Sequence, residues 1–287
     1  KKITPLYQKI WMDDGSPLRV YSHRITEALN SMTDDVEFEF AMRYGNPSIM
    51  SGLEKLKAKG VEELLLLPMF PHYAQATTES SLKHSYKQLA KMDWNPKIIE
   101  MGHFETDEEY VIPLTKSIQP HIDEDTHLLF SYHGLPVSHV KRIEKTKSHC
   151  QKIDNCCAIK KEANELCYGH HCMETTHTVV GLLGLKPDQW SISYQSRIGP
   201  VKWLEPSTTN KIEELVKRGV KKIAIVAPAF LADGLETLEE LDIGIREHFT
   251  ELGGEELTVV KCLNDNQDWI DGLFKLVEKR FSQAVSA

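Results

Sequence analysis

Short apolar runs alternate with longer amphipathic segments along most of this chain. The apolar runs have the length and composition of strands and span residues 64–69, 127–131, 190–194, 222–227 and 257–260. The amphipathic segments predict helices over residues 17–32, 47–58, 206–218, 235–250 and 267–281. Apolar strands separated by helices are typical of parallel sheets covered by helices on both faces. The alternation therefore predicts an α/β fold.

The length of the chain, 287 residues, suits two domains of about 140 residues each, close to the commonest domain size. The segment 104–126 ends in an acidic, polar stretch just before the apolar run at 127–131. We therefore expect a first lobe over residues 1–125 and a second lobe over residues 126–287. Residues 138–172 are rich in Lys and Cys, interrupt the alternation and are interpreted as an insertion in the second lobe.

The net charge argues against nucleic-acid binding, and the hydropathy argues against a membrane-spanning helix. The formal net charge of -8 argues against nucleic acid, because nucleic-acid binding relies on clustered Lys and Arg. No apolar run approaches the roughly 20 residues that a membrane-spanning helix needs. The chain starts at Lys1 without a methionine or a leader, so we expect that a preceding segment has been removed.

Ligands of open parallel sheets bind beyond the carboxyl ends of the strands, so a site is sought in the segments that follow the strands. Four of these segments are chemically unusual: PMFPHYAQATTESS (68–81), SYHGLP (131–136), YQSRIGPVKWLEP (194–206) and PAFLADGLETLEELDIG (228–244). The first carries aromatic and hydroxyl residues, but helix capping explains it at least as well as a site does.

The second and third segments each offer a functional and a structural interpretation. His133 stands at a strand exit, where a neutral imidazole can accept a proton or bind a metal near pH 7, although a structural loop histidine is the simpler alternative. Arg197 and Trp203 lie around a Gly-Pro turn. An aromatic plane beside a guanidinium suits a flat anionic ligand, and a Trp that covers a domain joint is the alternative.

The fourth segment carries carboxylates at helical spacing. Asp233, Glu236 and Glu240 fall at i, i+3 and i+7, which predicts three carboxylates on one helix face. A solvated acidic face is the usual explanation of such a stripe. Its position directly after a strand favours oxygen ligands for a divalent metal, or proton acceptors.

Six ordered blocks of this sequence resemble the ferrochelatase family, whose members insert ferrous iron into a porphyrin. The blocks are KIWMDDGSPL (9–18), AMRYGNPSI (41–49), LLPMFPHYAQATTESS (66–81), SYHGLP, YQSRIGPVKWLEP and PAFLADGLETLEELDIG. The resemblance implies two similar Rossmann-like lobes, each with a four-stranded parallel sheet flanked by helices. It also implies a macrocycle in the cleft between the lobes, protoporphyrin IX as the favoured porphyrin, ferrous iron (Fe2+) as the second substrate, and no organic cofactor.

The resemblance assigns roles to individual residues. His133 occupies the HGLP motif, whose histidine faces the porphyrin centre, and Glu236 occupies the ETL motif, whose glutamate also faces it. Asp233 and Glu240 continue the acidic line as a path for protons or iron. The residues that match positions lining the pocket or its entrance are Arg43, Tyr44, Tyr73, Trp203 and Phe230.

The sequence departs from the family pattern in two places. Family members normally begin with a further glycine-containing strand and a loop that forms a lip over the porphyrin, and this stretch is absent here. Gly234 stands where some relatives carry a histidine, so one candidate metal ligand is missing. The alternative functions are a cobalt chelatase acting on an earlier tetrapyrrole, and a non-enzymatic iron–sulfur sensor or haem-binding protein on the same scaffold.

Five of the six cysteines lie between residues 148 and 172: Cys150, Cys156, Cys157, Cys167 and Cys172. Their spacing fits a zinc ribbon poorly, because structural zinc usually takes a pair of Cys separated by two to four residues. Some ferrochelatases carry a 2Fe-2S cluster, and this resemblance makes four of the five cysteines candidate cluster ligands. Cys172 or one of the adjacent pair is expected to be dispensable, with zinc, disulfides or free thiols as the alternatives.

The expected partners are a porphyrin and ferrous iron. Haem synthesis implies a reducing cytoplasm, which also disfavours disulfides. Porphyrins are poorly soluble in water, so a peripheral contact with a membrane is compatible with this function, although the sequence has no amphipathic basic anchor.

Overall fold

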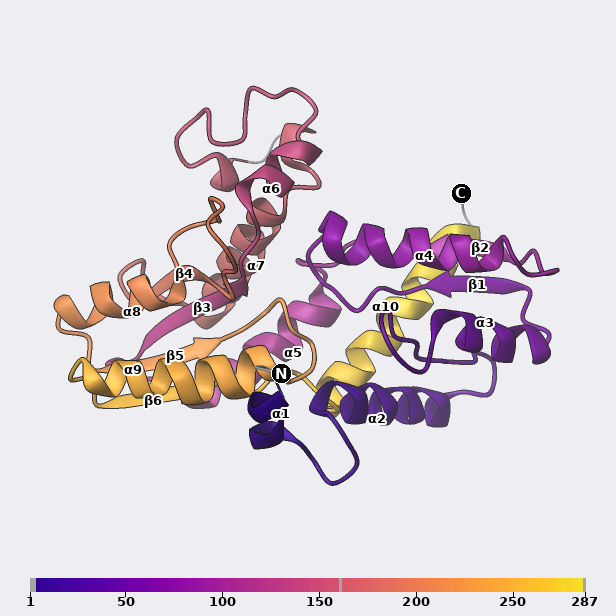
Figure 1. Ribbon diagram of the computed structural model, residues 1–287, viewed down its shortest axis with the longest axis horizontal. Coiled ribbons are helices and arrows are strands. Elements are labelled where there is room, and N and C mark those ends of the chain that lie inside the picture. The colour runs from indigo at the N-terminus through magenta and orange to yellow at the C-terminus, as the bar shows by residue number, and fades with distance from the viewer. Residues whose placement is uncertain (1–3, 160–161, 286–287) are drawn as a thin grey trace.

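The computed structural model describes residues 4–159 and 162–285, and it has an α/β fold built from two lobes (Figure 1). The strands are β1 (Glu63–Leu66), β2 (Lys97–Glu100), β3 (His127–His133), β4 (Trp190–Gln195), β5 (Lys222–Val226) and β6 (Glu256–Val259). The α-helices are α1 (Thr4–Ile10), α2 (Pro17–Met32), α3 (Ile49–Ala58), α4 (Ser80–Leu89), α5 (Glu108–Ile118), α6 (Val137–Ile143), α7 (Tyr168–Leu183), α8 (Thr208–Lys217), α9 (Arg246–Glu251) and α10 (Gln267–Val285). Two π-helices, η1 (Gln75–Glu79) and η5 (Leu235–Ile245), and short 3-10 turns, η2 (Gln119–His121), η3 (Cys156–Ala158) and η4 (Glu162–Asn164), complete the described elements.

The second lobe contains a four-stranded parallel sheet with the strand order β4-β3-β5-β6. Residues 127–132 of β3 are all buried, because β3 has a strand on each side and helices on both faces. The prediction of an α/β fold with parallel sheets is therefore confirmed. In the register of this sheet, His133 at the end of β3 lies opposite Gln195 at the end of β4.

The first lobe contains a parallel pair of strands, β1 and β2. The four strands implied by the family resemblance are thus present in the second sheet, whereas the described part of the first sheet has two. The apolar run that contains β1 was predicted, but β2 was not. Only Ile98 and Ile99 are apolar in this short strand, and both of its ends are exposed, so it lacks a clear strand pattern.

Four of the predicted helices, those over 17–32, 47–58, 206–218 and 267–281, are confirmed as α2, α3, α8 and α10. The helix predicted over 235–250 instead begins as the π-helix η5 and continues as α9. Helices α1, α4, α5, α6 and α7 were not predicted. Helix α5 lies within the acidic segment 104–126, because Glu108 and Glu109 form its first turn, where carboxylates favour a helix N-terminus.

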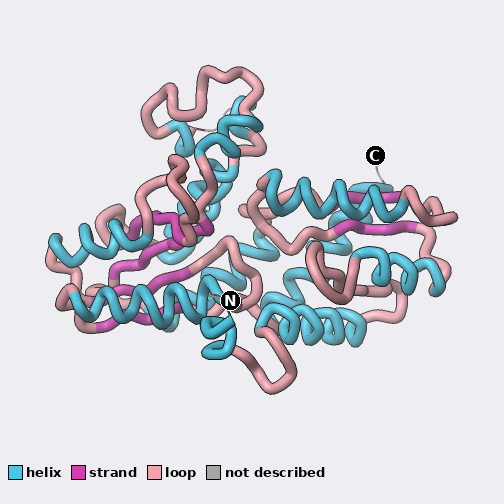
Figure 2. The backbone as a smooth tube through the Cα atoms, in the orientation of Figure 1, coloured by secondary structure: helices cyan, strands magenta, loops and turns pink. Residues whose placement is uncertain are grey.

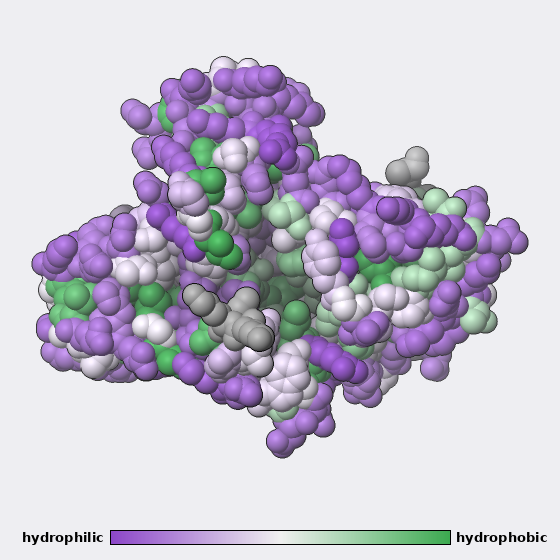
Figure 3. Space-filling model, in the orientation of Figure 1, coloured by the Kyte–Doolittle hydropathy of each residue, from purple (hydrophilic) through white to green (hydrophobic). Residues whose placement is uncertain are grey.

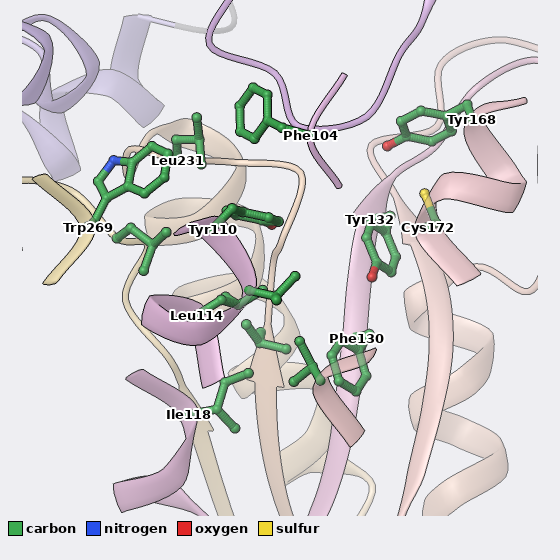
Figure 4. Packing of buried hydrophobic residues seen from close by; sticks show 14 of the residues in the cluster. Phe104, Tyr110, Leu114, Ile118, Phe130, Tyr132, Tyr168, Cys172, Leu231 and Trp269 are labelled. Carbon is green, nitrogen blue, oxygen red and sulfur yellow. The ribbon is translucent and has the colours of Figure 1, made fainter. Parts of the chain in front are cut away.

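Helix α10 returns to the first lobe, where it packs against α5, α2 and β2 (Figure 1). The core between these elements includes Trp269 of α10, stacked on Phe104 and at right angles to Tyr110 (Figure 4). Helix α5 also packs against α7. The expected boundary between the lobes near residue 125 stays a prediction. After β6, the chain leaves the second lobe and returns to the first as α10.

The two lobes repeat a local plan. Ser48 caps α3 by accepting from the amide of Ser51, and Ser207 caps α8 by accepting from the amide of Asn210. A π-helix follows β1 and another follows β5. Residues 144–159 and 162–167, within the expected insertion, are mostly loop and project from the second lobe beside α6 (Figures 1 and 2). None of the helices in the described residues is long and apolar enough to cross a membrane.

Candidate active site

The candidate site begins with His133 at the carboxyl end of β3, where the chain turns through Gly134. The Nδ1–H of His133 donates to the carbonyl of Gly134 at 2.7 Å, because a carbonyl only accepts. This bond fixes the tautomer, so Nε2 keeps its lone pair. The half-buried ring lies 6.1 Å from the ring of Phe230, between centroids. His133 can therefore accept a proton or bind a metal through Nε2.

The turn after His133 requires a glycine. A Cβ on Gly134 would lie 2.7 Å from the carbonyl oxygen of Gln195 and 3.3 Å from the ring of Trp203. The amide of Gly134 donates to that same carbonyl at 2.8 Å. Backbone and indole therefore enclose the turn, and they hold His133 at the edge of the sheet.

Glu236 lies in the first turn of η5, the helix that follows β5. β5 is the neighbour of β3, so the segment that carries Glu236 and the turn that follows His133 both leave the sheet at the carboxyl ends of adjacent strands. The side-chain amide of Gln195 donates to the backbone carbonyl of Glu236 at 2.8 Å, and its Oε1 accepts from Ser131 at 2.7 Å. Gln195 thus connects the histidine turn with the glutamate helix. Sequence reasoning missed this role, although Gln195 lies in the quoted YQSRIGP block.

Glu240 follows Glu236 by one turn of the π-helix, but its carboxylate is engaged elsewhere. One oxygen accepts from the amide of Ser196 at 2.8 Å and the other from the hydroxyl of Ser196 at 2.5 Å. Ser196 has a positive φ of 61°, a conformation that needs local support in a residue with a side chain. Glu240 therefore anchors the loop after β4, and its role in an iron path stays a prediction.

The prediction that Asp233 shares a helix face with the two glutamates is wrong, because η5 begins only after the extended residue Gly234. The Asp233 carboxylate is buried and points to Thr237, the amide of Cys262 and the side chain of Asn264, at 2.8, 3.3 and 2.7 Å. Both of its oxygens therefore have partners within the protein. A role for Asp233 in metal transfer stays a prediction.

The first lobe contributes aromatic and basic side chains from the loop before α3 and from the loop between β1 and η1. The hydroxyl of Tyr73 donates to Glu79 at 2.9 Å, and burial together with this carboxylate raises the pKa of Tyr73 to about 12. The guanidinium of Arg43 lies 4.5 Å from the centroid of the Tyr44 ring, which is 78% exposed. A cation over an exposed aromatic ring provides charge and a flat surface at one place.

The two lobes face each other across a hollow with apolar residues in its depth (Figure 3). A small cavity is lined by Ala74 and Gln75 of the first lobe and by Leu135, His139 and Tyr168 of the second. The start of η1 therefore approaches the segment that follows His133. The structure thus brings Tyr73, which directly precedes Ala74, to the same side of the molecule as the His133 turn.

Trp203 faces a second cavity of about 180 Å³, which it lines together with Tyr194, Cys150, Cys156 and Cys157. Its indole nitrogen is buried without a partner among the described residues. The opposite side of the indole contacts the position that a Gly134 Cβ would take. Trp203 thus lies between the His133 turn and the cysteines, and its predicted place in the porphyrin pocket stays a prediction.

Three of the five clustered cysteines, Cys150, Cys156 and Cys157, line this second cavity, and Cys167 forms a hydrogen bond with Cys157. The sulfurs of Cys156 and Cys157 are 3.9 Å apart. Burial raises the pKa of Cys150 to about 11. The hydrogen bond between Cys157 and Cys167 raises the pKa of Cys157 and, with amides at the start of α7, lowers the pKa of Cys167 to about 7. Cys172 instead lies fully buried beside Tyr132 and Tyr168 (Figure 4).

A cluster of His103, Glu105 and His171, which sequence reasoning missed, lies where the lobes meet. His103 Nδ1 lies 2.6 Å from the Glu105 carboxylate, and His171 Nε2 lies 3.7 Å from it. The Nδ1 of His171 accepts from the amide of Tyr73 at 3.1 Å, so its Nε2–H donates to the carbonyl of Glu165 at 2.7 Å. Both nitrogens of His171 therefore have hydrogen-bond partners, and the ion pair in the cluster is that of His103 with Glu105.

Two lobes with parallel sheets, a histidine at the end of β3 and a glutamate in the helix that follows the neighbouring strand β5 define a protein of the chelatase class. A family profile described as Ferrochelatase matches residues 1–281. Proteins named ferrochelatase from Ectopseudomonas mendocina (strain ymp) and Bdellovibrio bacteriovorus are 39% and 38% identical over 275 residues, which is 95% of this chain and 81% of each relative. This chain therefore belongs to the ferrochelatase family.

Two solved structures share the fold. SirB from Bacillus subtilis with Fe3+ gives a TM-score of 0.60 at 12% identity, and covers 93% of this chain and 90% of that one. A sirohydrochlorin chelatase SirB from Bacillus subtilis subspecies spizizenii in complex with cobalt gives 0.60 at 10% identity, over 91% and 88%. At this level of identity the likeness concerns the fold alone.

Proposed function

We propose that this protein inserts ferrous iron into a porphyrin, with protoporphyrin IX as the favoured substrate, to form haem. The observation that carries the proposal is that Gln195 binds the backbone of both candidate segments, the turn after His133 and the first turn of η5 with Glu236. The family membership supports the same reaction. The alternative is a cobalt chelatase that acts on an earlier tetrapyrrole. Such an enzyme would have the same fold, and metal-insertion assays with the different substrates distinguish the two functions.

Metal insertion replaces two pyrrole protons by one divalent ion, so the site must accept protons and guide a cation. His133 offers a lone pair at Nε2, because its Nδ1–H is already bound to the Gly134 carbonyl. Glu236 offers a carboxylate, and Gln195 holds the backbone of Glu236 by donating to its carbonyl. Arg43 and Tyr44 offer a cation and a flat surface at the entrance, suited to a macrocycle with carboxylate substituents.

Replacement of His133 tests the proposal. We expect His133→Ala to abolish metal insertion while the fold is retained, because the half-buried ring contributes little packing but carries the free lone pair. Initial rates with ferrous iron and protoporphyrin, coproporphyrin or sirohydrochlorin would be compared with those of His121→Ala, an exposed histidine in η2. Turnover of His133→Ala above about a tenth of the wild-type rate contradicts the assignment.

A 2Fe-2S cluster held by Cys150, Cys156, Cys157 and Cys167 is the second part of the proposal. Two sulfurs on one tetrahedral metal with bonds of about 2.3 Å lie about 3.8 Å apart, and Cys156 and Cys157 are 3.9 Å apart. Three of the four line one cavity, and Cys167 forms a hydrogen bond with Cys157. When bound, the cluster would supply a structural or sensing centre, since metal insertion transfers no electrons.

The fifth cysteine, Cys172, is the matched control. It is fully buried in the apolar core, away from the second cavity. We expect anaerobically purified protein to be reddish-brown, to lose its visible absorbance in Cys150→Ser and Cys167→Ser, and to keep it in Cys172→Ala. Colourless protein, or protein with stoichiometric zinc, contradicts the cluster.

A cytoplasmic location and a peripheral contact with a membrane remain part of the proposal through the family resemblance. The test measures the amount of the protein in the soluble and membrane fractions of lysed cells at low and high salt. It distinguishes a free cytoplasmic protein from one that contacts a membrane. Salt-sensitive recovery in the membrane fraction is the result expected for a peripheral contact.

A further inference from the structure

The first turn of α7 touches the carboxyl end of β3. The hydroxyl of Tyr168 donates to the backbone carbonyl of His133 at 2.9 Å. Tyr168 is buried, so this bond is shielded from water and its loss leaves a carbonyl without its partner. The position of the His133 backbone therefore depends on the position of α7.

The same turn also touches the first lobe. The amide of Tyr73 donates to Nδ1 of His171 at 3.1 Å, across a sequence separation of 98 residues. The Nε2–H of His171 donates to the carbonyl of Glu165 at 2.7 Å, in the segment that carries the cysteines. A single imidazole thus bridges the backbone of a candidate porphyrin-binding residue and the cysteine segment.

Two further contacts tie this turn to the sulfurs. His170 donates from Nδ1 to the carbonyl of Cys157 at 2.7 Å, and Cys167 is the residue that directly precedes α7. A Cβ on Gly169 would lie 2.9 Å from the sulfur of Cys157. Because a hydrogen-bonded helical turn moves as a unit, a shift of the cysteine segment displaces the contacts to His133 and Tyr73 together.

We propose that the first turn of α7 couples the cysteine segment to the chelation site, with Tyr168 and His171 as its positioning residues. Tyr168 holds the backbone of the proton-accepting histidine, and His171 holds the backbone of the porphyrin-lining tyrosine. A change of the cysteine sulfurs between the free and the cluster-bound state thereby shifts the backbones of His133 and Tyr73. This inference rests on the proposed chelatase function and adds a role for the insertion.

Three variants separate the contacts. Tyr168→Phe removes only the hydroxyl that holds His133, and it should lower kcat about tenfold with little change in the KM for porphyrin. His171→Asn keeps an acceptor near the position of Nδ1, and His171→Gln keeps a donor near the position of Nε2. Only His171→Gln should raise the KM for porphyrin, because only that variant leaves the Tyr73 amide without an acceptor. The control is Tyr86→Phe, which loses a hydrogen bond to Glu100 within the first lobe and should leave both constants unchanged.

A double-mutant cycle tests the coupling itself. In the wild-type background, Cys150→Ser should weaken the binding of protoporphyrin, measured by fluorescence titration without metal. In His171→Asn, which keeps the Tyr73 contact but loses the Glu165 contact, the same replacement should have a smaller effect. Additive effects of the two replacements overturn the coupling. A wild-type protein that binds porphyrin but inserts no metal contradicts the proposed function, and the binding cycle still decides the coupling.

Discussion

The side-chain amide of Gln195 donates to the backbone carbonyl of Glu236 at 2.8 Å, across the end of the second-lobe sheet. The backbone carbonyl of Gln195 accepts from Gly134 on the other side, at 2.8 Å. The two candidate catalytic side chains, on His133 and Glu236, are therefore separated by a third residue that binds the backbone of both segments. This arrangement gives Gln195 a positioning role in the proposed reaction.

Replacement of Gln195 by the isosteric glutamate tests this role. Gln195→Glu keeps an acceptor for Ser131 but loses the donor to the Glu236 carbonyl. We expect kcat to fall about tenfold or more with little change in the KM for porphyrin, because an oxygen now faces an oxygen and η5 shifts. Gln119→Glu, at an exposed residue, is the control. An unchanged kcat in a folded Gln195→Glu protein contradicts the positioning role.

Glu236→Gln separates binding from chemistry at the glutamate itself. The amide keeps the size of the side chain but neither accepts a proton readily nor carries charge. We therefore expect a loss of kcat of at least about a hundredfold, with a porphyrin KM within a few-fold of the wild-type value. Steady-state rates at saturating iron provide both constants. A large rise in KM at unchanged kcat would instead make Glu236 a binding residue.

Much of the second lobe could be predicted because its strands are buried on both faces. Residues 127–132 of β3 are all buried, and the apolar Leu128, Leu129 and Phe130 at their centre give the sequence a strong strand signal. The short β2 has only Ile98 and Ile99 to mark it, and α5 is hidden by the acidic residues of its own first turn. Hydropathy alone does not predict a strand that is only partly buried, or a helix whose first turn consists of charged residues.

The candidate site was predicted in part, for a similar reason. His133 and Glu236 lie in compact motifs that follow strands. The spacing of Asp233 assumed a continuous α-helix, but Gly234 is extended and η5 has the i→i+5 pattern of a π-helix, which a local sequence does not reveal. His103 and His171 lie 68 residues apart, and only the packing of α7 on the first lobe brings them together. Tertiary contacts of this kind leave no periodic signal.

Helix α10 should depend on a glycine at its contact with α5. A Cβ on Gly272 would lie 2.1 Å from the carbonyl oxygen of Glu109, so the backbone must shift to accommodate it. We expect Gly272→Ala to lower the free energy of unfolding by about 3 kcal/mol, at the upper end of the usual cost of overpacking. Gly181→Ala in α7 meets nothing within 4 Å and should raise it by about 0.5 kcal/mol through helix propensity. Urea denaturation provides both values, and effects of equal sign would contradict this account of the interface.

The ion pair between His103 and Glu105 should make stability depend on pH. The hydrogen bond that His103 donates to the Glu105 carboxylate raises the pKa of His103. Burial tends to raise the pKa of Glu105, but the bond with His103 and the nearby His171 outweigh it and lower that pKa to about 2. A raised histidine pKa stabilises the fold below the ordinary value of about 6.5, and this contribution is lost as the pH rises through the folded pKa. A lowered glutamate pKa stabilises it above about 4.5, and this contribution is lost as the pH falls towards 2.

The two contributions overlap between about pH 4.5 and 6.5, so His103→Gln should be most destabilising there. We expect a difference of about 1 kcal/mol near pH 5.5, because the His103 side chain is 34% exposed and solvent screens the pair. The difference should shrink by pH 9, where His103 is neutral in both the folded and the unfolded protein. Arg280 and Asp107 also act on His103, in opposite directions, and are unchanged in the variant. Urea denaturation at pH 5.5, 7 and 9, with the exposed His121→Gln as the control, measures the trend. A difference that grows with pH would mean that the neutral imidazole, and not the ion pair, stabilises this junction between the lobes.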